Sequence, residues 1–134
     1  MSRSRVGERI ALAIGGVLIG VPGVLMTFDT AGYVDGKDNL VLSPDMYSEL
    51  RALGAIFIAA ALTLLVGAFA PRWRQAALVV GAVAFVPQGV ARVVSYAINE
   101  GQHDSYLRAG IVELIVGAVL VGLLVTSSRR VGDA

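Results

Sequence analysis

The sequence contains no cysteine and a single histidine, His103. Without cysteine the chain forms no disulfide, has no thiol nucleophile and offers no thiolate to a metal ion. His103 lies in a predicted loop with no second histidine near it, so we predict neither a metal site nor a cofactor. The sequence also has no G-x-S-x-G, H-E-x-x-H or Walker pattern. These absences remove the common catalytic arrangements, and we predict that the protein is not an enzyme.

Charge is also scarce, because charged residues make up 16% of the 134 residues, whereas soluble domains have about 25%. The formal net charge of +1 provides no basic face, so we predict no nucleic-acid partner. Hydrophobic residues make up 56% of the chain, compared with about 45–50% in soluble domains. Both departures indicate a chain that lies in lipid.

Four apolar segments dominate the sequence, at 10–28, 52–70, 76–98 and 109–126. Each has about the 18–20 residues that a helix needs to cross roughly 30 Å of hydrocarbon. A soluble fold of this size has no interior that buries four helices that are apolar on every side. We therefore predict an all-α fold, an integral membrane four-helix up-down bundle that forms one transmembrane domain over residues 1–134. Its helices are expected near residues 10–28, 45–70, 76–98 and 107–126.

Positive charge gathers on one side of the predicted membrane. Lys and Arg mark the cytoplasmic side of membrane proteins, whereas the loops at 29–45 and 99–106 are acidic. We predict that both termini are cytoplasmic and that the acidic loops face outward. The first span would also fit a signal peptide, but its apolar run is long and no A-x-A cleavage site follows it. The arginines that set this orientation are Arg3, Arg5, Arg9, Arg72, Arg74, Arg129 and Arg130.

The two halves of the sequence resemble each other. The segment IGVPGV (19–24) is similar to FVPQGV (85–90), and SELRA (48–52) is similar to SYLRA (105–109), in the same order. This pattern favours two duplicated helical hairpins related by an axis along the membrane normal. The alternative is chance similarity between apolar segments of low complexity.

Prolines mark the ends and the interiors of the predicted helices. Ser43 and Pro44 predict a helix start, with serine as the N-cap and proline at the first helical position. Pro71 predicts the end of that helix. Pro22 and Pro87 lie inside the first and third spans, where each is expected to kink its helix.

A polar stripe interrupts the third span. Residues of a helix advance by about 100° each, which places Gln88, Arg92 and Ser95 on one face. At 1.5 Å per residue, Arg92 and Glu113 each lie about 9 Å inside the outer end of their helices. A buried arginine costs about 2.5–3.5 kcal/mol unless it finds a partner. We predict that Arg92 points into the bundle and pairs with Glu113, with Glu49 as a second acceptor.

Several of these side chains have two interpretations. The ion pair either belongs to a ligand site or proton path, or specifies only the register of the helices. Gln88 either lines a cavity or satisfies the backbone next to the neighbouring proline. Arg51 either joins the charged cluster or, like Arg108, anchors a lipid phosphate at the outer interface. The first span is expected to carry no charge and to contact its neighbours through Gly16 and Gly20.

Three segments resemble one family: ELRALGAIF (49–57), ARVVSYAINEG (91–101) and ELIVGAVL (113–120). They are similar, over roughly residues 45–125, to the small bacterial four-helix membrane proteins grouped as domain of unknown function 4345. The resemblance implies a charged cluster and a bacterial plasma (inner) membrane location, and it implies no activity. The residues at the positions of the family pattern are Glu49, Arg51, Arg92, Ser95, Gly101 and Glu113.

We therefore predict an accessory or ligand-binding membrane protein that lies among membrane lipids and takes a small polar or amphiphilic ligand. The alternatives are a small proton-coupled carrier and a structural subunit of a homo-oligomer or a larger membrane complex. The candidate ligand-binding or structural ion-pair cluster consists of Arg92, Glu113, Glu49, Arg51 and Gln88.

Overall fold

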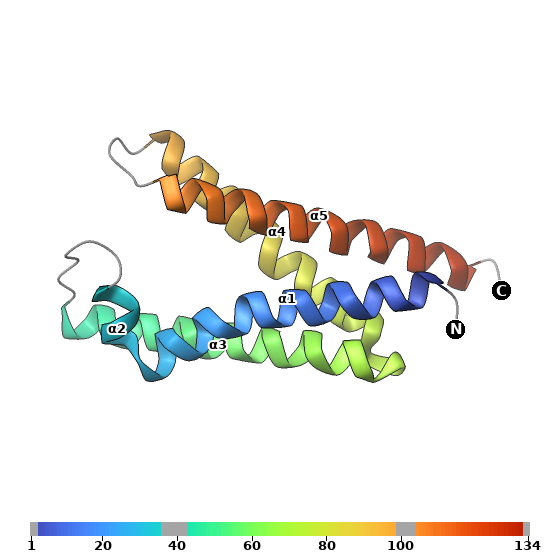
Figure 1. Ribbon diagram of the computed structural model, residues 1–134, viewed down its shortest axis with the longest axis horizontal. Coiled ribbons are helices and arrows are strands. Elements are labelled where there is room, and N and C mark those ends of the chain that lie inside the picture. Colours follow the sequence, from blue (N-terminus) through green and yellow to red (C-terminus); the bar gives the residue numbers. More distant parts are fainter. Residues whose placement is uncertain (1–2, 36–42, 99–103, 133–134) are drawn as a thin grey trace.

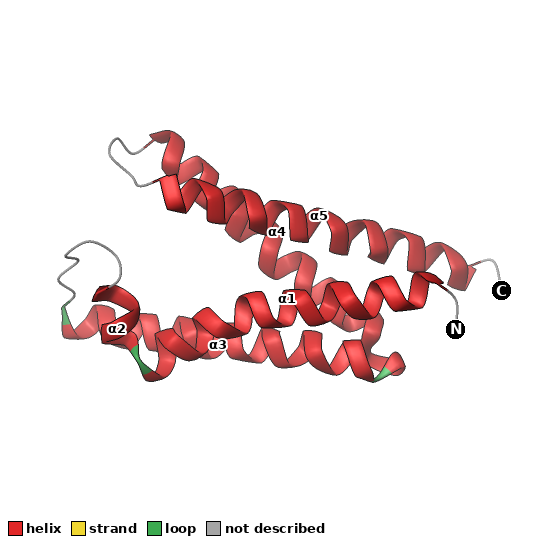
Figure 2. Cartoon of the chain, viewed as in Figure 1, coloured by secondary structure: helices red, strands yellow, loops and turns green. Residues whose placement is uncertain are grey.

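The computed structural model describes residues 3–35, 43–98 and 104–132. Among these residues every secondary-structure element is a helix, and short loops join them (Figure 2). Four helices are long and apolar enough to cross a membrane, in agreement with the four predicted spans. The elements are α1 (Arg3–Phe28), α2 (Thr30–Asp35), α3 (Pro44–Phe69), the 3₁₀ turn η1 (Pro71–Trp73), α4 (Arg74–Ile98) and α5 (Asp104–Gly132).

The prolines act at the helix ends as predicted. Ser43 is the N-cap of α3, where its Oγ accepts a hydrogen bond from the backbone N of Met46 at 3.3 Å, and Pro44 is the first helical residue. The chain leaves α3 before Pro71, which opens η1. Both α1 and α4 continue through their internal prolines, Pro22 and Pro87.

The helices extend further into the polar ends of the chain than predicted. The helix α1 begins at Arg3 rather than near residue 10, and α5 continues to Gly132 rather than ending near residue 126. Arginine is a good helix former, so a helix needs no apolar side chain to continue through such a segment. The apolar runs in the sequence therefore correspond to the middle of these helices and do not mark their ends.

The chain forms two hairpins (Figure 1). The first hairpin is α1 packed along α3, with the short α2 between them in sequence, and the second hairpin is α4 packed along α5. The hairpins meet mainly through α3 and α4. Consecutive long helices run in opposite directions, so both termini lie at the same end of the structure (Figure 1). Whether the hairpins arose by duplication stays a prediction.

Glycines allow the helices of each hairpin to cross closely. A methyl group built on Gly23 would lie 3.0 Å from the carbonyl oxygen of Gly54, and one built on Gly89 would lie 2.9 Å from that of Gly110. A side chain at these positions would push the backbones apart. Gly16 and Gly20 face α3 at Ala61 in the same way, as predicted from their spacing.

The two hairpins pack tightly at one end and separate at the other (Figure 1). We call the end that holds η1 and both termini the convergent end, and the end that holds α2 the splayed end. The main core lies towards the convergent end, where small residues such as Ala68, Ala77 and Gly81 let α3, α4 and α5 approach. At the splayed end bulkier side chains, among them Tyr33, Phe57 and Arg92, line the space between the hairpins. The core comprises Leu12, Ile19, Ala61, Leu64, Ala68, Ala77, Leu78, Phe85 and Leu120.

Candidate functional site

A polar cluster joins α4 to α5 near the splayed end. The Nε of Arg92 lies 3.0 Å from each carboxylate oxygen of Glu113, and it donates a hydrogen bond to Oε1. The same Oε1 accepts a hydrogen bond from Nε2 of Gln88 at 2.8 Å. The structure thus brings together three of the five predicted site residues, and the amide of Gln88 is directed to the carboxylate rather than to the backbone.

Only one of the N–H donors of Arg92 forms a hydrogen bond within this cluster. Among the described residues, Arg92 forms its hydrogen bond through Nε alone, which leaves the two Nη nitrogens without an acceptor. Its side chain is 26% exposed, twice the 13% of the Glu113 side chain. A guanidinium has five N–H donors, and four of them are on the Nη atoms. The carboxylate of Glu113 therefore holds the guanidinium at Nε, and the four N–H groups on the Nη atoms remain as donors.

Arg92 lies in the wall of a cleft between the two hairpins. The cleft has a volume of about 600 Å³ and lies towards the splayed end. Its polar lining comes mostly from the second hairpin, and Tyr33 on α2 adds a phenol from the first. Its apolar lining comes from both hairpins. The lining residues are Met26, Tyr33, Leu53, Phe57, Ala84, Pro87, Gln88, Ala91, Arg92, Ser95 and Tyr106.

The structure does not bring Glu49 to Arg92, which corrects the expectation of a second acceptor. Glu49 is exposed on α3, and its carboxylate forms no hydrogen bond or ion pair with the described residues. The cleft separates this end of α3 from α4. Helix depth placed the two residues at one level, but depth says nothing about the lateral distance between hairpins.

Arg51 and Arg108 also lie outside the cluster. Arg51 donates from Nε to Oγ1 of Thr30 at 3.3 Å, which ties α3 to the start of α2. Arg51 is therefore not part of the Arg92 cluster, and its role as a lipid anchor stays a prediction. Arg108 is exposed on α5, in a position that suits the predicted lipid anchor.

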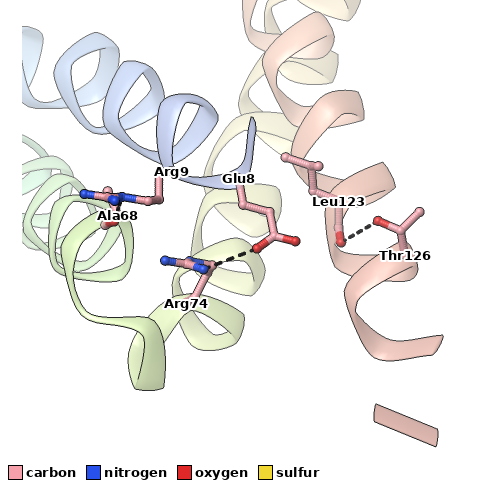
Figure 3. A network of polar contacts seen from close by, with 6 residues as sticks. All are labelled: Glu8, Arg9, Ala68, Arg74, Leu123 and Thr126. Atoms are coloured by element: carbon pink, nitrogen blue, oxygen red, sulfur yellow. Dashed lines mark hydrogen bonds and ion pairs between the residues drawn. The ribbon is translucent and has the colours of Figure 1, made fainter. Parts of the chain in front are cut away.

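A second ion pair, which sequence reasoning missed, holds the hairpins together at the convergent end (Figure 3). Glu8 on α1 is 4% exposed, and its Oε2 lies 3.6 Å from Nη1 of Arg74 at the start of α4. The next residue, Arg9, donates from Nε to the carbonyl oxygen of Ala68 at 3.1 Å. The expectation that the first span carries no charge is therefore wrong, because α1 starts before the apolar run.

The sequence contained a signal for Glu8. With Leu12, Gly15 and Ile19 it follows the spacing of one helix face, and all four are buried. A lone carboxylate on the buried face of a helix needs a counter-charge. In the sequence Arg74 indicates only the cytoplasmic side, and that charge pattern does not pair it with Glu8.

Comparisons with known proteins indicate a family but no activity. No curated protein and no solved structure matches the chain. A family match begins inside α1 and ends inside α5, so it covers more of the chain than the segments that first suggested the resemblance. Residues 7–124 match the family described as Domain of unknown function (DUF4345), and the chain belongs to this family.

Proposed function

We propose that the protein is a binding protein of the bacterial plasma membrane, with its convergent end on the cytoplasmic side. Its ligand carries a hydrogen-bond acceptor group, a phosphate or a carboxylate, and occupies the cleft between the hairpins. The observation that carries this proposal is the guanidinium of Arg92, which lines the cleft and is held at Nε by Glu113, while its Nη donors have no acceptor among the residues that the structure describes. Arginine is suited to phosphate and carboxylate because two parallel N–H groups meet two oxygens.

The charge balance of the cluster indicates how the ligand is recognised. Glu113 offsets the charge of Arg92, so the pair attracts anions weakly at long range. Hydrogen-bond geometry at short range must then provide the affinity. Ser95 and Tyr106 also line the cleft. A ligand with several acceptor oxygens fits such a lining better than a simple halide.

The lining of the cleft favours binding over transport. A carrier requires a path to the other side of the membrane, and this path would cross the convergent end. There Leu12, Leu64, Leu78 and Leu120 are fully buried, and the Glu8–Arg74 pair joins the hairpins. The cleft lies towards the splayed end and does not continue through this core, which suits a binding site better than a transport path.

The test measures thermal unfolding of the purified protein in detergent with added glycerol phosphate or butyrate. We expect the ligand to stabilise the natural protein, and we expect Arg92→Met to weaken binding by about 10–100-fold, the loss of a charged hydrogen bond. The matched control is Arg108→Met, which removes an exposed arginine from the same end of the second hairpin. An Arg92→Met protein that keeps the full ligand-dependent shift would overturn the proposal.

A further inference from the structure

The cleft adjoins an apolar hollow deeper in the structure. This second hollow lies between α3 and α4, has a volume of about 470 Å³ and shares Phe57, Ala84 and Gln88 with the cleft. Gln88 is its single polar lining residue. The other lining residues are Ile19, Ile56, Phe57, Ala60, Val79, Val80, Val83 and Ala84.

Cleft and hollow together form a groove whose chemistry changes along its length. Arg92 lines its upper part and Val80 its lower part. Twelve residues of α4 separate them, which correspond to about 18 Å at 1.5 Å per residue. The groove therefore starts with hydrogen-bond donors at the splayed end and continues with hydrocarbon towards the convergent end. A phospholipid of the outer leaflet has the same order of polarity in the same direction.

The hollow is also open to the side. Val83 is 67% exposed and Ile56 is 64% exposed, although both line it. These helices are long and apolar enough to cross a membrane, so such side chains face acyl chains in a bilayer. A lipid chain can therefore enter between α3 and α4 laterally, without leaving the hydrocarbon.

We infer that the ligand of the cleft is an anionic membrane lipid, with its phosphate at Arg92 and one acyl chain in the groove between α3 and α4. This inference rests on the proposed function, because it places the head of the lipid at the same guanidinium. It adds the chemical class of the ligand and the path of its chain. Moving an acyl chain from the bilayer into the groove exchanges one apolar surface for another, so the hydrophobic effect contributes little to binding. The chain contributes through its shape, which must match that of the groove. Selectivity then resides in the phosphate and in the shape of the groove.

The test uses photo-crosslinking in phosphatidylcholine nanodiscs that contain phosphatidic acid with a diazirine near the end of one chain. We expect adducts to concentrate on residues 56–60 of α3 and 79–84 of α4. Adducts spread evenly over the lipid-facing sides of all four long helices would overturn the inference, because they report bulk lipid. This map is made on the natural protein, so it is decisive even if a variant fails to fold.

A matched pair of variants tests the groove itself. Ala60 lines the hollow, whereas the neighbouring Ala59 is exposed and does not. Ala60→Phe fills the groove and should lower the adduct yield at 79–84 by about tenfold. Ala59→Phe should leave the yield unchanged. Equal yields in the two variants would contradict a chain between α3 and α4.

The outcomes separate this inference from the proposed function. If glycerol phosphate stabilises the protein through Arg92 while the chain adducts are spread evenly, the cleft binds a water-soluble anion and the lipid assignment is wrong. If Arg92→Met keeps the groove adducts at full yield, the phosphate of the lipid does not lie at Arg92 and the lipid assignment is wrong, whereas the thermal shift with glycerol phosphate still decides the proposed function. Loss of groove adducts in both Arg92→Met and Ala60→Phe supports both.

Discussion

The two ends of the molecule use the same charge chemistry for different purposes. At the convergent end Glu8 and Arg74 belong to different hairpins, and their side chains are 5% and 12% exposed. At the splayed end Arg92 and Glu113 belong to one hairpin, and Arg92 keeps 26% of its side chain exposed. The first pair joins two units, whereas the second pair orients a donor within one unit. The difference shows that partner location and exposure, rather than residue type, decide what an ion pair does in this protein.

The packing around the two pairs follows the same division. Small residues at the convergent end let the hairpins touch, and Arg74 lies against this dry contact, where its Nε is buried without a hydrogen bond to a described residue. At the splayed end the aromatic rings of Tyr33 and Phe57 line an open cleft. The contacts that hold the two hairpins together thus lie at one end of the molecule, and the cleft lies at the other.

The largest effect is expected from breaking the convergent pair. Glu8→Ala leaves Arg74 buried without its counter-charge, which should lower the free energy of unfolding by about 3–5 kcal/mol. Unfolding in detergent mixtures with increasing dodecyl sulfate measures this loss. Arg5→Ala, at an exposed position of the same helix, should stay within about 0.5 kcal/mol of the natural protein. Equal losses in the two variants would show that the Glu8–Arg74 pair does not join the hairpins.

A smaller loss is expected from the splayed pair. Glu113→Gln removes the charge that Arg92 faces, and this should lower the free energy of unfolding by about 1.5–3 kcal/mol, the range for hydrogen bonds to charged groups. The loss is smaller because Arg92 can turn its guanidinium into the open cleft. The same unfolding titration measures it. A loss as large as that of Glu8→Ala would contradict the contrast between the two ends.

Replacing a glycine where two helices cross should destabilise the protein to a similar extent in both hairpins. Gly54→Ala places a methyl group 2.8 Å from the carbonyl oxygen of Gly23, and Gly89→Ala places one 2.9 Å from that of Gly110. Each should cost about 1–3 kcal/mol by overpacking, measured by thermal unfolding. Gly122→Ala is the control, since no atom lies within 4 Å of the added methyl group. A neutral Gly89→Ala variant would mean that α4 and α5 do not approach closely there.

The smallest effect is expected at α2. Arg51→Met removes the hydrogen bond to Oγ1 of Thr30, which should cost about 0.5–1.5 kcal/mol. The change should be local, so amide hydrogen exchange should accelerate in residues 30–35 and stay unchanged in 61–68 of the core. Arg108→Met provides the comparison, because it removes an exposed arginine far from α2 along the chain. Unchanged exchange in 30–35 would show that Arg51 does not hold α2.

Sequence reasoning succeeded where one helix at a time sufficed. Composition and length predicted the four spans, and the Ser43–Pro44 pair predicted the start of α3. Helical spacing put Arg92 on the face that meets α5, because burying an unpaired guanidinium in lipid is costly. These predictions depend on periodicity and on local transfer energies, both of which a single sequence contains.

It did not succeed where the distance between hairpins mattered. Glu49 and Arg92 share a level, yet the splay of the hairpins keeps them apart. Glu8 was overlooked because the polar segment that precedes a span was interpreted as a topology signal and not as part of a helix. The hydrogen bond from Arg51 to Thr30 depends on the short α2, which is too short to leave a periodic pattern.

The most extensive helix–helix interfaces of the molecule are between long helices that follow each other along the chain, α1 with α3 and α4 with α5. Each hairpin can therefore form from its own two long helices, without contacts from the other hairpin. Glu8 enters with the first pair of helices, but its partner Arg74 arrives only at the start of the next pair. The Glu8–Arg74 pair can therefore form only after the chain has reached the start of α4, so this link between the hairpins closes later than the first hairpin itself.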